Sequence, residues 1–219
     1  LLRAPFVLPF LATMKARMDF YYGGAQATLY DAHRDRMLHG KLPLILSIPW
    51  RQSAARQRLL LVGGGTGDLL AKMGPILSQL SGVTVSDLST PMIEVARARL
   101  RDLGIDDRAR AVVEDACASF QSHPDGSYDV VMISYALTMM PRWKECVDNA
   151  VRHLAPGGLL GVCDFCDDDA SSIDTQRFMF RLSGVDVTTP CRAYLASNPQ
   201  LTTLFQRTAR GSLPFTGAR

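Results

Sequence analysis

The sequence predicts an α/β protein built on a doubly wound, mainly parallel sheet. Three features predict this class: short apolar runs typical of strands, apolar stripes at helical spacing between them, and a glycine-rich turn after the first run. Strands that alternate with helices in this way pair in parallel and are covered by helices on both faces. The chain has 219 residues, 47% of them hydrophobic, which is enough for one such domain with its own core.

The first 50 residues precede this alternation. A helical spacing is shared by Tyr30, His33, Arg34, Met37 and Leu38, and two prolines, at 43 and 49, interrupt the chain shortly afterwards. We therefore expect residues 1–50 to form a helical lid region and residues 51–219 to form the sheet domain. The chain starts with Leu1 rather than methionine, so we expect it to be part of a longer, multidomain protein.

Five apolar segments in the rest of the chain are predicted to be strands. Each is continuous rather than alternating, as expected of strands that are buried on both faces of a sheet. They cover residues 59–62, 83–85, 111–113, 130–133 and 159–162. A helical stripe over residues 69–80 follows the first strand, strained by a Gly-Pro pair. The next helix is expected to begin at Ser89 or Thr90, with Pro91 in its first turn.

Composition excludes several classes of protein. The formal net charge of +3 is too small to indicate nucleic-acid binding and would at most favour an anionic lipid surface. Five cysteines, an odd number scattered through predicted strands and helices, do not form the pattern of a secreted disulfide framework, so we expect an intracellular protein. No run approaches the roughly 20 apolar residues needed to span a bilayer, so peripheral membrane contact is the most that we expect.

The strongest local signal is Val-Gly-Gly-Gly-Thr-Gly at residues 62–67, directly after a predicted strand and before a predicted helix. Glycine lets the backbone come close to a ligand there, and the following helix begins with N–H groups that have no partner inside the helix. Gly63, Gly65 and Gly67 are therefore candidate cofactor-binding residues. A glycine fingerprint alone also fits dinucleotides, phosphates or a turn without a ligand.

A carboxylate at the end of the second predicted strand narrows the choice of ligand. Asp87 follows Gly67 by about 20 residues, where a carboxylate can accept hydrogen bonds from a ribose diol. Cofactors with a free ribose, of the NAD type or the S-adenosylmethionine type, therefore fit. In the alternative interpretation, Asp87 only caps the following helix.

Two further segments favour S-adenosylmethionine. Glu114-Asp115-Ala116 follows the third predicted strand, and Pro156-Gly157-Gly158 precedes the fifth. With the glycine turn and Asp87, this series resembles the class I S-adenosylmethionine-dependent methyltransferases, a Rossmann-like family, over residues 58–165. The resemblance implies that the acid after the third strand binds the adenine amino group. The cofactor site that it implies consists of Tyr22, Tyr30, Gly63, Gly65, Gly67, Asp87, Leu88, Met92, Asp115, Ala116 and Ser134.

Two features depart from that family. Leu61 stands where its members usually have an acid that orients the methionine end of the cofactor. The family's sheet ordinarily ends with an antiparallel sixth and seventh strand, but no convincing strand pair follows Ile173. We therefore expect this C-terminal strand pair to be missing, either because the chain is truncated or because the sheet has a shorter edge.

A narrower resemblance begins at the fourth predicted strand. Residues 134–141, Ser-Tyr-Ala-Leu-Thr-Met-Met-Pro, resemble the SYSLSMIP segment of betaine-lipid synthases, and residues 161–165 resemble their GVVDF segment. The N-terminal region follows their Y…QA..YD..R…G pattern at Tyr22, Gln26, Ala27, Tyr30, Asp31, Arg34 and Gly40. The resemblance implies an N-methyltransferase that trimethylates the amine of diacylglyceryl homoserine, with S-adenosylmethionine as cofactor and a lipid as acceptor.

Methylation of an amine needs a proton acceptor and a site that tolerates a cation. The candidate catalytic residues, each able to take the proton, are Tyr135, Tyr30 and Asp164. The product is a quaternary ammonium, which aromatic faces attract. The candidate aromatic side chains are Tyr22, Tyr30, Tyr135 and Phe165. Arg34 or Arg192 is expected to bind the carboxylate of the substrate.

Two alternatives stay open. One is a methyltransferase that acts on a quinone ring or a small-molecule amine, because the Tyr-Asp pair at residues 30–31 is shared with such enzymes. The other is a catalytically silent module with the cofactor fold, which Leu61 and the short C-terminus would fit. No metal site is expected, because Cys163 and Cys166 lack a second ligand pair at zinc spacing, and the acidic run at 167–169 is interpreted as a solvated loop.

Overall fold

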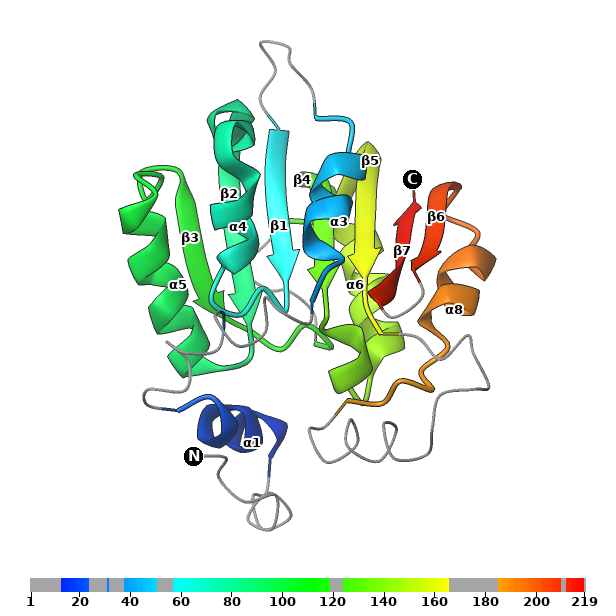
Figure 1. The fold of residues 1–219 in the computed structure, drawn as a ribbon, viewed down its shortest axis with the longest axis horizontal. Coiled ribbons are helices and arrows are strands. Elements are labelled where there is room, and N and C mark those ends of the chain that lie inside the picture. The colour runs from blue at the N-terminus through cyan, green and yellow to red at the C-terminus, as the bar shows by residue number, and fades with distance from the viewer. Residues whose placement is uncertain are drawn as a thin grey trace.

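The fold is a seven-stranded sheet with helices on both faces (Figure 1). It is taken from a computed structural model that describes residues 13–23, 31, 38–50, 57–118, 124–165, 185–209 and 212–218. The strand order is β3-β2-β1-β4-β5-β7-β6. Strands β1 to β5 pair in parallel, and β7 is antiparallel to both of its neighbours. This arrangement confirms the predicted doubly wound α/β class.

The five parallel strands lie where the apolar runs predicted them. They are β1 (Gln57–Val62), β2 (Leu80–Asp87), β3 (Ala109–Val113), β4 (Tyr128–Ser134) and β5 (Leu154–Cys163). The described helices are α1 (Met14–Tyr21), α3 (Lys41–Ser47), α4 (Asp68–Met73), α5 (Thr90–Asp102), α6 (Trp143–His153) and α8 (Cys191–Ser197), with the short 3-10 helices η2 (Gly74–Gln79) and η3 (Leu137–Met139). The connections from β1 to β2, from β2 to β3 and from β4 to β5 therefore pass back over a face of the sheet, through α4 with η2, α5 and α6 respectively.

Two hydrophobic cores lie on opposite faces of the sheet. On one face, Leu59 and Leu61 of β1 pack with α3, α4 and α5. On the other face, Leu60 and Val62 of the same strand pack with α6 and α8. Because alternate side chains of a strand point to opposite faces, a strand covered on both faces needs apolar side chains at every position. The continuous apolar runs of the sequence follow from this double burial.

Local sequence explains two helix boundaries. Ser89 caps α5, since its side chain accepts a hydrogen bond from Met92 N at 3.4 Å, and Pro91 occupies the first turn. Gly74, with a φ of 52°, ends α4, and the chain continues as η2. The single helical stripe expected over residues 69–80 is therefore two shorter elements.

The C-terminal edge of the sheet differs from the expectation. Strands β6 (Thr203–Ala209) and β7 (Ser212–Ala218) are both present, and β7 pairs with β5. The prediction that this strand pair is missing is wrong. Pro214 and Gly217 lie within β7, and both residue types weaken the sequence pattern of a strand. Pairing with β5 and β6, which no local pattern reports, holds the segment in the sheet.

Helix α3 belongs to the core of the sheet although it precedes residue 50. Leu44 and Ile45 are buried, and Leu44 packs over Gly161 of β5, where a Cβ atom would lie 2.9 Å from Leu44 Cδ1. Gly161 thus lets the helix approach the sheet closely. The expected lid region at residues 1–50 includes this helix, and the lid role of that region stays a prediction.

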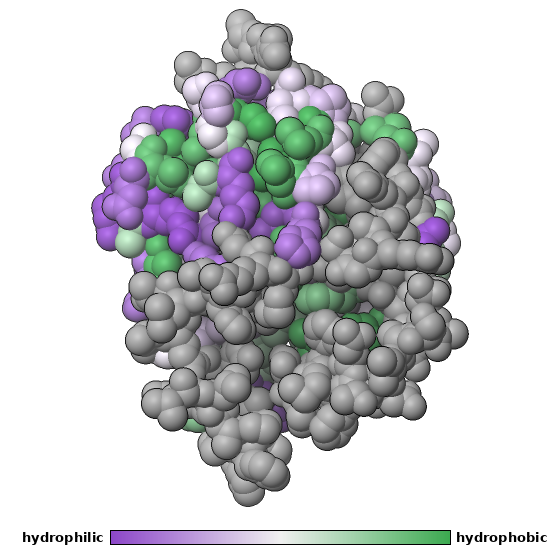
Figure 2. All heavy atoms as spheres, in the orientation of Figure 1, coloured by the Kyte–Doolittle hydropathy of each residue, from purple (hydrophilic) through white to green (hydrophobic). Residues whose placement is uncertain are grey.

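The outer surface differs between neighbouring helices. Polar side chains gather over α5, whereas apolar side chains are exposed over α3 (Figure 2). Leu42 and Leu46 of α3 are 51% and 72% exposed. Across the described ranges, no helix combines the length and the apolar character that a membrane span requires.

Candidate functional site

A cavity lies at the carboxyl ends of the parallel strands, the edge at which sheets of this class bind ligands. The segments that line it include residues 61–66 at the end of β1, 87–88 at the end of β2, 114–117 after β3, and 134–136 and 139–142 at and after the end of β4. Side chains from α1 and from the start of α3 and α4 complete the walls. The topology therefore brings together side chains that are far apart in the sequence.

The glycine-rich loop after β1 has the backbone conformation that its sequence predicts. Gly63, Gly65 and Gly67 have φ values of 59°, 55° and 70°, a region that other residues rarely adopt. A Cβ atom on Gly63 would lie 2.6 Å from Ala136 Cβ, whereas one on Gly65 would meet nothing within 4 Å. Packing therefore requires glycine at 63, and Gly65 faces open space. Gly67 precedes α4 and is not among the described residues that line the cavity.

Asp87 connects this loop to the end of β2. Its Oδ2 accepts a hydrogen bond from Gly65 N at 2.8 Å, and its Oδ1 accepts one from Ser89 N at 2.9 Å. Burial raises the pKa of the Asp87 carboxyl, and these backbone donors oppose the rise. Since Ser89 itself caps α5 and Asp87 lines the cavity, the alternative in which Asp87 is only a helix cap is not supported.

The loop after β3 forms an acidic end of the cavity. Asp115 Oδ1 accepts a hydrogen bond from Cys117 N at 2.9 Å, and Asp115 Oδ2 pairs with Arg142 at 3.1 Å. The Asp115 side chain is 43% exposed, so this ion pair is weak and can rearrange around a ligand. Glu114 and Ala116 line the same end.

Most of the predicted cofactor-binding residues meet at this cavity. Those that line it are Tyr22, Gly63, Gly65, Asp87, Leu88, Met92, Asp115, Ala116 and Ser134. Tyr30, Gln26, Ala27 and Arg34 lie outside the described residues. Arg192, expected to bind a substrate carboxylate, lies on α8 and is not among the described residues of the lining. Contact between the lining residues and a cofactor stays a prediction.

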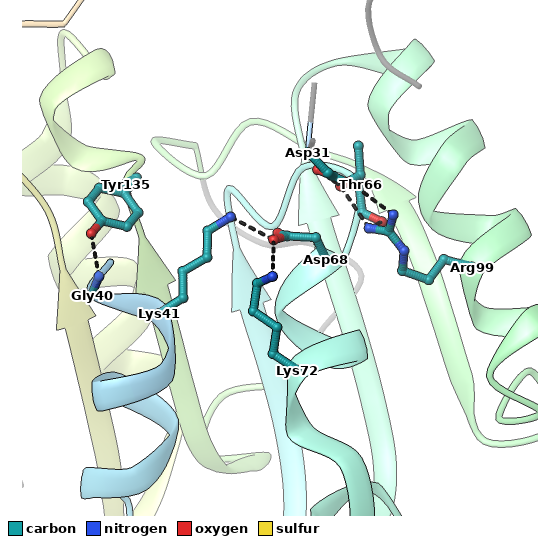
Figure 3. Close-up of polar contacts among 8 residues, drawn as sticks. All are labelled: Asp31, Gly40, Lys41, Thr66, Asp68, Lys72, Arg99 and Tyr135. Carbon is teal, nitrogen blue, oxygen red and sulfur yellow. Dashed lines mark hydrogen bonds and ion pairs between the residues drawn. The ribbon is translucent and has the colours of Figure 1, made fainter. Parts of the chain in front are cut away.

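Tyr135 does not fit the expected role of general base. Its hydroxyl accepts a hydrogen bond from Gly40 N at 2.8 Å, which directs it to the start of α3 (Figure 3). Burial, with a smaller contribution from Cys163, raises the pKa of the phenol far above its ordinary value, so the phenol stays protonated at neutral pH. The residue has a φ of 55°, a strained conformation outside glycine. It still lines the cavity, and its ring packs against Phe165 with the centroids 5.2 Å apart.

Asp164 has a structural position rather than the expected catalytic one. Its carboxylate is buried and accepts hydrogen bonds from the turn that follows β4. The donors are Ala136 N at 2.9 Å, Leu137 N at 2.7 Å, Thr138 N at 3.3 Å, Thr138 Oγ1 at 2.6 Å and Phe165 N at 2.8 Å. Burial raises the pKa of Asp164, and these donors oppose the rise. Asp164 is not among the described lining residues, so its expected proton-accepting role is replaced by that of holding this turn.

Sequence reasoning missed a buried ion pair beside the glycine-rich loop. Lys41 Nζ lies 2.6 Å from Asp68 Oδ2, and Lys72 Nζ lies 3.8 Å from the same oxygen (Figure 3). Lys41 and Asp68 line the cavity, whereas Lys72 is not among the described residues that do. Lys41 follows Gly40 and Asp68 follows Gly67. A charge directly after a glycine at the start of a helix is the signal that could have identified them.

A second polar network holds the outer side of the loop. Thr66 Oγ1 donates a hydrogen bond to Asp31 Oδ1 at 2.7 Å, and an Arg99 nitrogen lies 2.6 Å from Asp31 Oδ2. Arg99 also donates to Thr66 O at 2.8 Å (Figure 3). The network therefore joins residue 31, the glycine-rich loop and α5. Its members lie 33 to 68 residues apart, so no local pattern indicated it.

Comparison with known proteins places the middle of the chain among methyltransferases. Residues 60–160 match the family described as a methyltransferase domain. The chain is 37% identical over 109 residues to the ubiquinone/menaquinone biosynthesis C-methyltransferase UbiE of Psychromonas ingrahamii, covering 50% of this chain and 43% of that protein. It is 36% identical over 141 residues to the protein of the same name from Vibrio parahaemolyticus, covering 64% and 54%. The chain thus spans about half the length of the curated relatives it matches.

Solved structures share the arrangement of the sheet. The YcgJ protein from Bacillus subtilis has a TM-score of 0.63 at 21% identity, over 78% of this chain and 73% of that one. An O-methyltransferase family protein from Burkholderia thailandensis has a TM-score of 0.70 at 17% identity, over 89% and 59%. The chain has the class I methyltransferase fold. The cofactor of this methyltransferase domain is S-adenosylmethionine, as the sequence predicted. The relatives named here are not betaine-lipid synthases, so that narrower assignment is a proposal.

The cavity of the methyltransferase domain fits this cofactor at three points. Asp87 ends β2, where a carboxylate can hold the ribose, and Asp115 follows β3, where an acid can hold the adenine. Gly65 leaves open space beside the loop. When bound, the cofactor supplies an electrophilic methyl group on a sulfonium. The residues that line the cavity would align this methyl donor with its acceptor, and such orientation accounts for much of the rate of a transfer.

The cysteines and acidic residues show no metal site within the described ranges, where no three His, Cys, Asp or Glu side chains are grouped to hold an ion. Cys163 is a buried free cysteine, and burial raises the pKa of its thiol to about 12, so the thiol is inert. Cys166 and the acidic run at 167–169 lie outside the described residues.

Proposed function

We propose that the methyltransferase domain transfers methyl groups to the amine of diacylglyceryl homoserine and forms a trimethylated betaine lipid. One observation carries this proposal: the segment at 134–141, which resembles betaine-lipid synthases, forms one wall of the cavity. Its lining residues are Ser134, Tyr135, Ala136, Met139, Met140 and Pro141. The part of the sequence that points to this acceptor is thus next to the glycine-rich loop, where an acceptor must lie to receive the methyl group.

The chemical character of the cavity supports a charged amine product in an apolar setting. Tyr22 and Tyr135 present aromatic side chains to the cavity, and aromatic faces attract a quaternary ammonium. Met14, Met18 and Met139 add polarizable apolar surface to the same walls. A site of this kind can hold the increasingly methylated nitrogen without a countercharge beside it.

The acceptor nitrogen must be unprotonated to react, and neither of the two described candidates for a base can take its proton. The Asp164 carboxyl lies under the turn after β4 and is not among the described residues that line the cavity, and the Tyr135 phenol keeps its own proton. We therefore expect the proton to leave to solvent before transfer. The rate should rise about tenfold per pH unit until pH reaches the pKa of the acceptor amine, and then level off.

Incubation with S-adenosylmethionine and diacylglyceryl homoserine in detergent micelles, followed by mass spectrometry of the lipid, tests this proposal. Mono-, di- and trimethylated products should appear in turn. A protein that binds the cofactor but leaves this lipid unchanged would contradict the acceptor assignment while leaving the fold and cofactor in place.

A second candidate is C-methylation of a quinone ring, favoured by the two relatives, which are named as ubiquinone/menaquinone C-methyltransferases. The same apolar walls suit a ring with a prenyl tail. The assay separates the two acceptors directly when a demethylated quinol replaces the lipid under reducing conditions. Methylation of the quinol with no methylation of the lipid would establish the second candidate in place of the first.

A further inference from the structure

The buried ion pair between Lys41 and Asp68 is part of the cavity wall. Lys41 Nζ lies 2.6 Å from Asp68 Oδ2, and their side chains are only 7% and 13% exposed. Figure 3 shows the pair between the start of α3 and the start of α4, with Lys72 of α4 below Asp68 in this view. We propose that this pair binds the amino-acid end of S-adenosylmethionine, with Lys41 at its carboxylate and Asp68 at its ammonium. The proposal rests on the cofactor assignment.

The other charged groups of the described lining leave this end of the cofactor to Lys41 and Asp68. Asp87 is placed for the ribose, and Glu114 and Asp115 belong to the adenine end, where Arg142 pairs with Asp115. The described lining has two cationic side chains, and the one that does not lie at the adenine end is Lys41. A cofactor whose adenine lies beside β3 and whose ribose lies beside β2 extends its amino-acid end towards β1, where Asp68 follows the glycine-rich loop.

A contribution to the stability of the fold does not by itself explain why this ion pair is buried. Removing two charges from water costs free energy that their mutual attraction often fails to return, so buried ion pairs are weak evidence for stabilisation. Asp68 also has Lys72 as a second cation, with Nζ 3.8 Å away and a side chain that is 29% exposed. Asp68 would therefore keep Lys72 as a cationic partner if Lys41 were absent. The position of Lys41 in the cavity wall is better explained by a ligand that it binds.

A zwitterion complements this arrangement. An amino-acid group carries one cation and one anion a few ångströms apart, and an ion pair can bind it with each charge beside its opposite. Both lysines contact Oδ2 of Asp68 among the described residues, which leaves Oδ1 to accept from an ammonium. Leu61 and Val62, the lining residues of β1 itself, have only hydrocarbon side chains. The charge needed to fix this end of the cofactor therefore comes from α3 and α4.

The experiment compares three ligands by titration calorimetry: S-adenosylhomocysteine, its decarboxylated analogue, and 5′-methylthioadenosine, which lacks the whole amino-acid end. Lys41→Met should weaken S-adenosylhomocysteine roughly 10- to 100-fold and leave 5′-methylthioadenosine within about twofold. It should also leave the decarboxylated analogue nearly unchanged. Asp68→Asn should instead weaken both ligands that carry the ammonium. Lys72→Met is the matched control, because it removes the other partner of Asp68, and all three affinities should stay the same.

Equal weakening of all three ligands by Lys41→Met would overturn the proposal, since it would show a purely structural ion pair. If Lys41→Met does not fold, Lys41→Arg and the parent chain decide the question. Both should prefer S-adenosylhomocysteine to its decarboxylated analogue by at least about tenfold, and equal affinity for the two would exclude a cation at the carboxylate. A parent chain that binds none of the three ligands would instead refute the cofactor assignment itself.

Discussion

The β1–β2 side of the cavity and the β4–β5 side each place an aspartate at the end of a buried strand. Asp87 and Asp164 both accept backbone hydrogen bonds, and burial raises the pKa of both. They differ in the loop that supplies the donors. The glycine-rich loop binds Asp87 from one side and leaves it on the cavity wall, whereas the turn after β4 surrounds Asp164.

The register of the sheet explains this difference. Ser134 at the end of β4 pairs with Cys163 at the end of β5, so the residues that follow the two strands meet directly. The turn after β4 therefore lies over the Asp164 carboxylate. The function of a strand-end carboxylate thus depends on the loop of the neighbouring strand, and its own position in the sequence does not determine it.

The largest expected effect concerns the β4–β5 side. Asp164→Ala removes the acceptor of several buried donors, so the free energy of unfolding should fall by about 3–5 kcal/mol. Urea denaturation, monitored by circular dichroism, measures this free energy of unfolding. A loss below about 1 kcal/mol would show that the turn after β4 keeps its conformation without Asp164. The structural role that distinguishes Asp164 from Asp87 would then be refuted.

The matching change on the β1–β2 side should act on binding instead. Asp87→Ala should lower the affinity for S-adenosylhomocysteine by about 2–4 kcal/mol, or roughly 30- to 1000-fold, because charge-assisted hydrogen bonds to the ribose are lost. Calorimetry gives the dissociation constant, with urea denaturation as the control for folding. An unchanged dissociation constant would show that Asp87 only stabilises the conformation of the glycine-rich loop.

The raised pKa of Asp164 predicts a dependence of stability on pH. Between about 4, the ordinary value, and the higher value in the folded protein, the native state keeps a proton that the unfolded chain has lost. Its contribution to stability therefore falls as pH rises, by at most about 1.4 kcal/mol per pH unit. The parent chain should thus lose stability relative to Asp164→Asn from about pH 4 upwards. A parent chain that gains stability over this range would mean that the hydrogen bonds outweigh burial.

The smallest expected effect distinguishes packing from chemistry at Tyr135. Tyr135→Phe removes the acceptor of Gly40 N, so stability should fall by about 1 kcal/mol. The aromatic face remains, and methyl transfer to the preferred acceptor should stay within about threefold of the parent rate. A loss of activity of a hundredfold or more, with cofactor affinity unchanged, would restore the phenol as a proton acceptor.

The parallel strands, the glycine-rich loop and the place of Asp87 could be predicted because each depends on local sequence. A buried strand needs a continuous apolar run, and a loop with positive φ at Gly63 and Gly65 needs glycine. Strands β6 and β7 could not be predicted in this way. Their residues are mixed in polarity, and pairing with β5 rather than a local pattern makes them strands.

The roles of individual polar side chains were the least predictable part of the site. Asp164 follows a strand as Asp87 does, and only the register of β4 against β5 shows that it faces a turn. The pair formed by Lys41 and Asp68 joins residues 27 apart in the sequence. Its existence depends on how closely α3 packs over Gly161, which is a property of the assembled core.

The network of Asp31, Thr66 and Arg99 has a consequence for how quickly a ligand can bind. These contacts hold the glycine-rich loop from its outer side, with Arg99 anchored on α5. We therefore expect the loop to keep this conformation when a ligand binds, so that little conformational entropy is lost on association. Such a preorganised loop favours a bimolecular association rate that increases linearly with ligand concentration, without a slow ordering step.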